Sequence, residues 1–256
     1  MALDLGLLDG YKDYTRFIII GRSRSGSNFL RGLLNSHKQI VVLGELFQNK
    51  TAIGWAYPGY LQTQRDLAMF RQEPVLFLET KVFKRFPRRV LAVGFKIFYY
   101  HAQDESWKPV WNYLVEQKKI KVVHIKRKNI LRTHLSRKLA NMTDTWVNTS
   151  GNHQNQRVVS LDYEECLLDF SQTREWENSF DQYFCDHEKI EVFYEDLARD
   201  HPSEMGRIQE FLGVEREEVN PQTFKQSNQP LRQAILNYQE LKERFTGSSW
   251  EPFFEE

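Results

Sequence analysis

Two arginines, three serines and two glycines are crowded into a short segment near the start of the chain, GRSRSGSN, residues 21–28. An apolar run precedes this segment, and an apolar pattern with helical spacing follows it. A strand, a glycine-rich loop and a helix in this order can enclose an anion, because backbone N–H groups point into the loop and the helix N-terminus adds positive potential. Charge-assisted hydrogen bonds contribute ~1.5–3 kcal/mol each, against ~0.3–1 kcal/mol for an exposed helix end. Arg24 and the serine hydroxyls are therefore expected to bind a phosphate-like group.

The spacing from Gly21 to Gly26 matches the G-x-x-x-x-G of nucleoside-triphosphate loops, which continue with Lys and Ser or Thr. Here Ser27 and Asn28 occupy those two positions. No lysine is present to reach the β- and γ-phosphates, and an asparagine is a poor magnesium ligand. The loop thus suits a phosphate but not Mg-ATP, and a P-loop kinase or NTPase remains the alternative, with Glu195-Asp196 after a predicted strand as its faint metal-binding signal.

A second concentration of positive charge lies between Gln117 and Thr143, where there is no acidic residue. Lys126, Arg127 and Lys128 come directly after a predicted strand, at the edge where open α/β sheets bind ligands. Because the loop at Gly21 also follows a strand, the two segments predict two anion sites on one rim and a ligand with two separated phosphates. A nucleic-acid-binding module is another candidate, since positive charge suits phosphate backbones, but the chain has no such motif and its net charge is only +1.

The elements that position these residues follow from hydrophobic periodicity. Strands are expected at 15–20, 39–43, 93–99, 120–125 and 189–194. Helices are expected at 28–36 with Asn28 as its cap, 61–71, 106–117, 130–139, 161–184 with a break near Ser171, 201–212 and 231–245. Strands that alternate with helices predict an α/β fold, a parallel sheet with helices on both faces, in a single domain spanning residues 1–256.

Composition restricts the class of protein further. With 41% hydrophobic and 14% aromatic residues, the chain can bury a sizeable core. Cys166 and Cys185 form no metal-ligand or disulfide pattern. No secretory signal and no window of ~18 apolar residues is found, so we expect a cytoplasmic protein without a membrane-spanning segment. The polar stretch 141–157 predicts a lid or binding loop, with a surface excursion as the alternative.

Four segments, in order, resemble the sulfotransferase family that uses 3′-phosphoadenosine 5′-phosphosulfate (PAPS). RSGSN, residues 24–28, resembles its 5′-phosphosulfate loop, and IKVVHIKRKNILRTHLS, residues 120–136, resembles its 3′-phosphate segment. The family's Arg-to-Ser spacing is eight, whereas Arg127 lies nine and Lys128 eight residues before Ser136; we favour Arg127. Residues 192–214 resemble a late family signature, and residues 224–250 resemble the C-terminus of bacterial carbohydrate-type members, including nodulation-factor sulfotransferases.

The resemblance covers about residues 17–250 and implies a three-layer P-loop-type fold, PAPS as cosubstrate, and transfer of a sulfuryl group to an acceptor hydroxyl. The acceptor would be a small molecule or glycan, with carbohydrate or glycolipid expected from the C-terminal segment. Nucleic acid and metal are not expected as partners, since a terminal sulfuryl group carries less charge than a γ-phosphate. The expected PAPS ligands are Arg22, Ser23, Arg24, Ser25, Gly26, Ser27, Asn28, Arg127, Ser136 and Lys225.

Family members use either Glu or His as general base. Glu45 follows the second predicted strand and is favoured over His101, which follows the third; a general base contributes ~10²–10⁴-fold. Lys96 is expected to stabilise the bridging oxygen, together with the charge of Arg24. Trp55, Tyr57 and Trp146 are aromatic residues that suit an acceptor site or a core equally well. A PAPS-binding protein without activity remains an alternative if neither base is placed to act.

Overall fold

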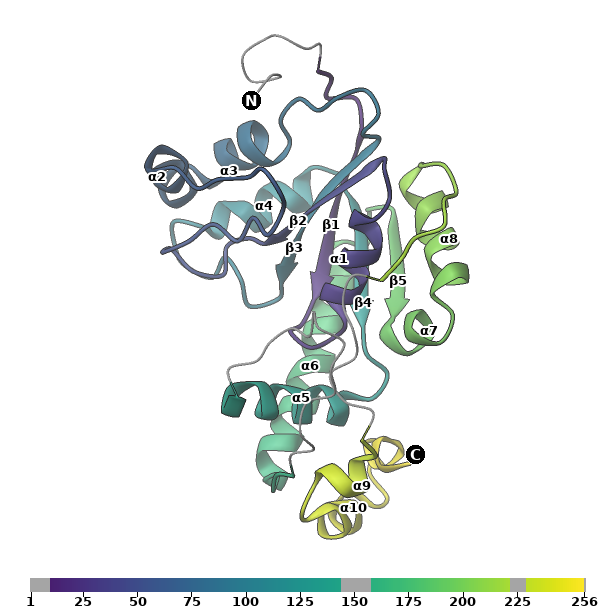
Figure 1. The fold of residues 1–256 in the computed structure, drawn as a ribbon. Coiled ribbons are helices and arrows are strands. Elements are labelled where there is room, and N and C mark those ends of the chain that lie inside the picture. The colour runs from purple at the N-terminus through teal and green to yellow at the C-terminus, as the bar shows by residue number, and fades with distance from the viewer. Residues whose placement is uncertain (1–9, 144–157, 222–228, 256) are drawn as a thin grey trace.

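Five parallel strands form one sheet in the computed structural model, which describes residues 10–143, 158–221 and 229–255. The strands are β1 (Thr15–Gly21), β2 (Ile40–Glu45), β3 (Ala92–Phe98), β4 (Lys121–Lys126) and β5 (Lys189–Phe193), in the spatial order β2-β3-β1-β4-β5 (Figure 1). Parallel neighbours need crossover connections, which helices supply here. All five strands predicted from periodicity are confirmed.

The helices connect the strands and extend beyond the sheet. Their bounds are α1 (Ser27–Asn35), α2 (Gln64–Gln72), α3 (Pro74–Phe77), the π-helical turn η1 (Leu78–Val82), α4 (Lys108–Glu116), α5 (Ile130–Thr143), α6 (Tyr163–Tyr183), α7 (Tyr194–Arg199), α8 (His201–Leu212), α9 (Leu231–Ala234), α10 (Tyr238–Phe245) and the 3₁₀ turn η2 (Glu251–Phe254).

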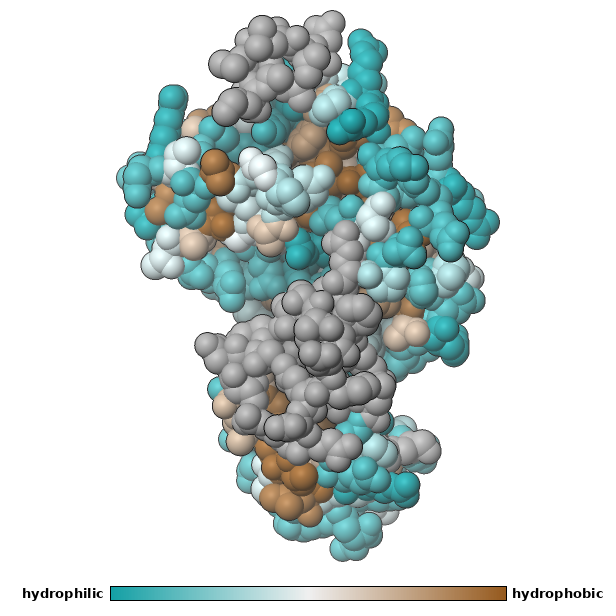
Figure 2. Space-filling model, in the orientation of Figure 1, coloured by the Kyte–Doolittle hydropathy of each residue, from teal (hydrophilic) through white to brown (hydrophobic). Residues whose placement is uncertain are grey.

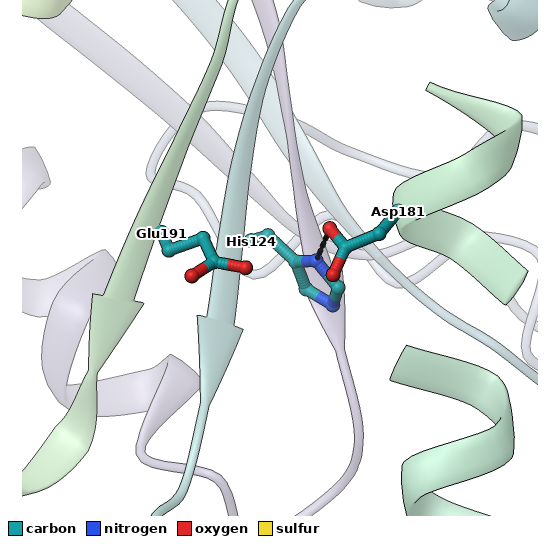
Figure 3. Close-up of side chains that lie close together, drawn as sticks. All are labelled: His124, Asp181 and Glu191. Carbon is teal, nitrogen blue, oxygen red and sulfur yellow. Dashed lines mark hydrogen bonds and ion pairs between the residues drawn. The ribbon is translucent and has the colours of Figure 1, made fainter. Parts of the chain in front are cut away.

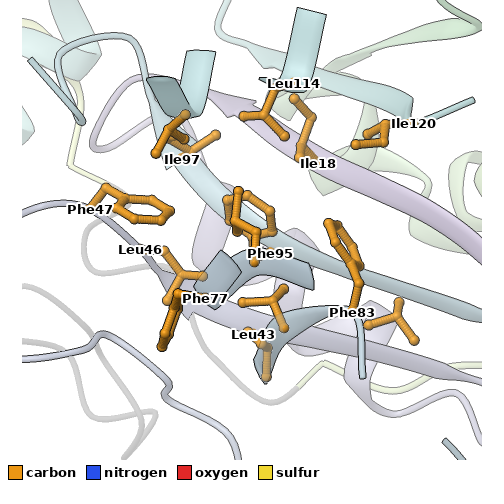
Figure 4. Close-up of a cluster of buried hydrophobic side chains, with 14 of the residues drawn as sticks. Ile18, Leu43, Leu46, Phe47, Phe77, Phe83, Phe95, Ile97, Leu114 and Ile120 are labelled. Atoms are coloured by element: carbon orange, nitrogen blue, oxygen red, sulfur yellow. The ribbon is translucent and has the colours of Figure 1, made fainter. Parts of the chain in front are cut away.

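The two faces of the sheet are covered by different helices. Alternate residues of a strand point to opposite faces. On one face Ile18 and Phe95 pack with side chains from α3, η1 and α4, including Phe77, Phe83 and Leu114 (Figure 4). On the other face Phe17, Ile19 and Val123 pack against α1, α7 and α8. This three-layer arrangement confirms the predicted α/β fold.

A third hydrophobic cluster lies beyond the carboxyl ends of the strands, where α5, α9, α10 and one end of α6 gather (Figure 1). Phe170 of α6 is fully buried against Phe245 and Phe253. In Figure 2 hydrophilic and apolar residues are mixed on the visible upper part of the molecule, and a patch of apolar residues lies at this lower end. These helices therefore lie next to the carboxyl edge of the sheet, where the predicted site residues are.

Three expectations about the helices are wrong. Helix α6 runs without a break at Ser171, because that residue is exposed while Phe170 and Thr173 bury the opposite side. The helix expected at 231–245 is two helices, since Ile235 is extended and bridges to Val159. Helix α5 continues to Thr143, so the polar stretch expected from residue 141 begins later, and its remainder up to residue 157 lies outside the described residues.

Within the part of the chain that the structure describes, no helix is both long and apolar enough to cross a bilayer.

Candidate active site

The loop of residues 22–26 joins β1 to α1 at the carboxyl edge of the sheet. Its conformation uses positive φ angles at Arg24 (67°) and Gly26 (92°), a region that costs an L-residue about 1–2 kcal/mol. Gly26 is the N-cap of α1, and no side chain caps this helix. The expectation that Asn28 caps the helix is therefore wrong. Asn28 is the second residue of the helix, and its amide oxygen accepts a hydrogen bond from Lys96.

Tyr194, the first residue of α7, packs directly on this loop. A Cβ atom added to Gly26 would overlap the Tyr194 ring. The Tyr194 ring also lies next to a cation, since the Arg127 guanidinium carbon is 4.7 Å from the ring centroid. Gly26 is thus required both for its φ angle and for this close approach.

The two predicted anion segments meet. Arg24 Nε donates to Ser136 Oγ at 2.9 Å, and Arg127 Nη1 donates to the backbone oxygen of Arg24 at 3.1 Å. Burial lowers the pKa of both arginines below the ordinary value, and the charge of Arg127 adds to this effect on Arg24. At neutral pH two cations, from the loop after β1 and the turn after β4, therefore share one small region with a hydroxyl from α5, although 112 residues separate Arg24 from Ser136.

The side chains of Arg127 and Lys128 have different surroundings. Arg127 is favoured from the sequence because it comes directly after the strand. Lys128 points outward, with its side chain 52% exposed, and its Nζ pairs with Asp196 at 2.8 Å. Arg127, with a side chain 13% exposed, faces the loop. Of the two residues, Arg127 is the one whose side chain reaches the loop of residues 22–26.

A buried lysine connects the loop to the end of β2. Lys96 of β3 has a side chain only 1% exposed, and its Nζ donates to Asn28 Oδ1 at 2.5 Å, to Glu45 Oε1 at 2.9 Å and to Ser27 Oγ at 3.3 Å. Burial lowers the pKa of Lys96, while the Glu45 carboxylate acts in the opposite direction. The Lys96 ammonium group therefore links the Glu45 carboxylate to the first two residues of α1.

His101 is placed differently from Glu45. The imidazole is 2% exposed, its Nδ1 lies 3.1 Å from the backbone oxygen of Leu46, and burial lowers its pKa to about 4. The Glu45 side chain remains 27% exposed at the rim. A base must contact the acceptor hydroxyl, so the geometry favours Glu45 over His101.

The backbone around Glu45 is closely fitted. A Cβ atom on Gly54 would overlap the Glu45 backbone oxygen, and Gly44 N donates to Trp55 O at 2.6 Å. Phe47 and Ala102, just past the ends of β2 and β3, have positive φ angles of 60° and 54°. Strained backbone of this kind concentrates at functional sites. The loop after β2 is thus folded back over the strand end that carries Glu45.

Comparison with known proteins shows which family the chain is part of. The sulfotransferase domain family matches residues 14–256. The chain belongs to this family. Among solved structures, a sulfotransferase from Alicyclobacillus acidocaldarius superposes with a TM-score of 0.51 at 14% identity, covering 93% of this chain and 92% of that one, and so shares its fold.

Two sulfotransferase-family relatives of this chain are named nodulation protein H. The protein of Rhizobium tropici is 25% identical over 244 residues, covering 93% of this chain and 92% of the relative. That of Rhizobium meliloti (strain 1021) is 26% identical over 247 residues, covering 93% and 94%. The match extends over nearly the full length of both proteins, and it supports the bacterial carbohydrate-type branch of the sulfotransferases.

Some predicted residues have different surroundings from those expected of ligands. The Arg22 guanidinium turns to α6, where Nη2 donates to Asp169 Oδ1 at 2.5 Å. Trp55 lies in the core, stacked on Phe77 with ring centroids 5.1 Å apart. Tyr57 is partly buried against the same cluster. Lys225 and Trp146 lie outside the described residues.

Sequence reasoning did not identify Tyr194, Arg137 or Asp169 as site residues. Tyr194 offered one signal, since it directly follows β5 at the edge where parallel strands place ligand-binding residues. Asp169 and Arg137 lie inside long helices, and no local pattern separates them from ordinary polar helix positions.

A second polar cluster lies between β4, β5 and α6 (Figure 3). His124 is fully buried, and its Nδ1 lies 3.0 Å from Asp181 Oδ1. Lys126 Nζ donates to both Asp181 and Glu191. Lysine ammonium groups thus already neutralise the carboxylates, and the cluster joins the two strands to the helix as a set of ion pairs.

Proposed function

We propose that this sulfotransferase moves a sulfuryl group from PAPS to a hydroxyl of a carbohydrate or glycolipid, with Glu45 as general base. The observation that carries the proposal is the contact of Lys96 Nζ with both Glu45 and the first residues of α1, Ser27 and Asn28. It places a candidate base beside the loop that would hold the phosphosulfate.

The loop residues fit an anionic ligand of this kind. The Ser25 hydroxyl is buried and has no hydrogen-bond partner among the described residues. Buried polar groups are normally satisfied, so a ligand oxygen is a natural partner for it. Arg24 supplies a charge at the 5′ side, and Arg127 with Ser136 would hold the 3′-phosphate.

PAPS supplies the sulfuryl group, which leaves its bisphosphate when the acceptor oxygen bonds to sulfur. Glu45 would accept the proton of the acceptor hydroxyl, since its carboxylate is partly exposed at the rim. Lys96 would orient that carboxylate through its 2.9 Å contact. By giving up its 3.3 Å hydrogen bond to Ser27 Oγ, it would donate its third N–H toward the bridging oxygen that gains charge. Preorganised donors in a buried site stabilise such charge more than they would in water.

The acceptor class rests on the relatives, which are named nodulation proteins, and on the C-terminal resemblance to carbohydrate-type members. The exposed Glu45 side of the site would receive the acceptor hydroxyl.

Calorimetric titration with adenosine 3′,5′-bisphosphate, without metal, tests the donor site. We expect micromolar or tighter binding, loss of at least tenfold in affinity for Arg24→Ala and Arg127→Ala, and little change for Lys128→Ala. Lys128 is the matched control because it adjoins Arg127 but pairs with Asp196 on the surface. Binding of Mg-ATP in place of the bisphosphate would contradict the proposal and favour a kinase or NTPase.

Turnover of a PAPS donor with carbohydrate and glycolipid acceptors separates an active sulfotransferase from a binding protein without activity. The metal-binding signal of the kinase alternative is weakened by the structure. Glu195 accepts hydrogen bonds from the backbone N–H groups of Lys128 and Asn129, and Asp196 binds the Lys128 side chain. Both carboxylates thus brace the turn between β4 and α5.

A further inference from the structure

Asp169 of α6 gathers three cationic or ionisable side chains that surround the predicted phosphosulfate loop. Arg22 Nη2 donates to its Oδ1 at 2.5 Å, and Arg22 Nη1 donates to its backbone oxygen at 3.1 Å. Arg137 donates to Oδ2, and His134 Nδ1 lies 3.2 Å from the same oxygen. The carboxylate is therefore the common acceptor for a residue of the loop and for two residues of α5.

Both arginines also control the loop backbone. Arg22 is itself the first residue after β1, and its guanidinium carbon lies 5.0 Å from the centroid of the Trp176 ring. Arg137 Nη1 donates to the backbone oxygen of Ser23 at 3.4 Å. The backbone N–H of Ser23 donates in turn to the Tyr100 hydroxyl at 3.3 Å. The first half of the loop is thus fixed by contacts from α5, from α6 and from the segment after β3.

The charges explain why the carboxylate matters. The side chains of Arg22, Arg137 and Asp169 are only 11–14% exposed. Burial lowers the pKa of Arg137 to about 10, so it is still protonated at neutral pH. Although burial acts to raise it, the pKa of Asp169 is held below the ordinary value by His134, Arg137 and Arg22. Two neighbouring guanidinium groups without an anion between them would repel each other and pull the loop apart.

We propose that Asp169 is a positioning residue that holds Arg22 and Arg137 away from the anion site and thereby sets the conformation of the loop. The anion then takes its side-chain charge from Arg24 and Arg127, and not from Arg22. The identity of the anion as a phosphosulfate rests on the proposed function, whereas the positioning of the loop does not.

The test compares Asp169→Asn with Glu177→Gln. Glu177 lies on the same helix, its side chain is 6% exposed, and it pairs with Arg174, which donates to the backbone of Lys128 and not to the loop. Two measurements are made on each folded variant, namely amide hydrogen exchange of residues 22–27 without ligand and the affinity for adenosine 3′,5′-bisphosphate.

We expect Asp169→Asn to raise loop exchange at least tenfold and to weaken bisphosphate binding at least tenfold, while Glu177→Gln changes neither by more than about twofold. Unchanged exchange in Asp169→Asn, equal effects of the two variants, or tighter bisphosphate binding by a released Arg22 would each overturn the inference. If the wild-type protein does not bind the bisphosphate, the proposed function fails, and the exchange experiment still decides the role of Asp169.

A second variant covers the case in which Asp169→Asn does not fold. Arg137→Gln removes the contact to the Ser23 oxygen and leaves Asp169 paired with Arg22, so the buried charge is balanced. We expect it to fold and to raise exchange at residues 22–27 about threefold or more. Exchange equal to that of the wild type would refute the inference by itself.

Discussion

Replacing Gly26 by alanine tests whether the loop requires both a left-handed backbone and contact with Tyr194. Gly26 has a φ angle of 92°, and its added Cβ atom would overlap the Tyr194 ring, which is held between the loop and Arg127. The substitution therefore combines a conformational cost with a steric one, and the two can be separated with a second glycine.

Gly59 provides the matched control. Its φ angle of 80° is similar, but an added Cβ atom would meet no atom of the described residues within 4 Å. A left-handed conformation costs an L-residue about 1–2 kcal/mol, and the lower entropy of the unfolded alanine chain offsets about 0.4–1 kcal/mol. Gly59→Ala is thus expected to lower the free energy of unfolding by about 1 kcal/mol. Overpacking adds about 1–3 kcal/mol, so Gly26→Ala is expected to lower it by about 2–4 kcal/mol.

Urea denaturation of the two variants and the wild type measures both quantities, and calorimetry measures affinity for adenosine 3′,5′-bisphosphate. The Gly26 variant should also bind the bisphosphate at least tenfold more weakly, whereas the Gly59 variant should bind it normally. Equal stability losses in the two variants would show that the Tyr194 contact is not tight, and unchanged bisphosphate binding by Gly26→Ala would refute the assignment of this loop to the donor.

Three further outcomes follow from the strand ends. Glu45→Gln should lower kcat by ~10²–10⁴-fold in a sulfuryl-transfer assay, while His101→Gln should stay within about threefold of the wild type; the reverse order would make His101 the base. Lys96→Met should lower kcat by about 10²-fold with bisphosphate affinity changed less than fivefold, and a loss confined to bisphosphate affinity would restrict Lys96 to donor binding. Burial lowers the pKa of His101 to about 4, so between pH 6.5 and 4 the unfolded chain binds a proton that the folded protein excludes. The free energy of unfolding of the wild type should therefore fall relative to His101→Gln by up to about 3 kcal/mol across that range, and parallel curves would show that His101 is not buried.

The strands could be predicted from the sequence because each is a short apolar run that ends at a polar or glycine residue. Their order could not, since pairing of β1 with both β3 and β4 depends on contacts between distant segments. Helix boundaries failed where tertiary contacts outweighed periodicity. Ile235 continues the apolar stripe of a helix, yet its backbone pairs with Val159, which no spacing within residues 231–245 indicates.

The loop of the candidate site could be identified because the chemistry needs its residues close together in sequence. The segments of Arg24 and Ser136 were expected on one edge of the sheet, because both follow strands, but as two separate anion sites. The direct hydrogen bond from Arg24 to Ser136 was not expected. The brace at Asp169 is of another kind. It joins a loop residue to a helix 147 residues further along the chain, and its carboxylate looks the same in sequence as any exposed acid of α6.

The basic segment from residue 117 to 143 shows why charge along a chain is not charge at a site. Seven of its cationic side chains pair with carboxylates from other segments: Lys118 with Asp186, Lys121 with Glu188, Lys126 with Asp181, Arg127 with Glu195, Lys128 with Asp196, Arg137 with Asp169 and Lys138 with Glu165. Arg127 differs from the others because, besides this 3.6 Å ion pair, its Nη1 donates to the backbone oxygen of Arg24. The cations of a segment without acidic residues can pair only with carboxylates of other segments. Most of its charge is then used in ion pairs that stabilise the fold. Which cation can bind an anion at the loop therefore depends on which side chain at the end of the strand points toward that loop.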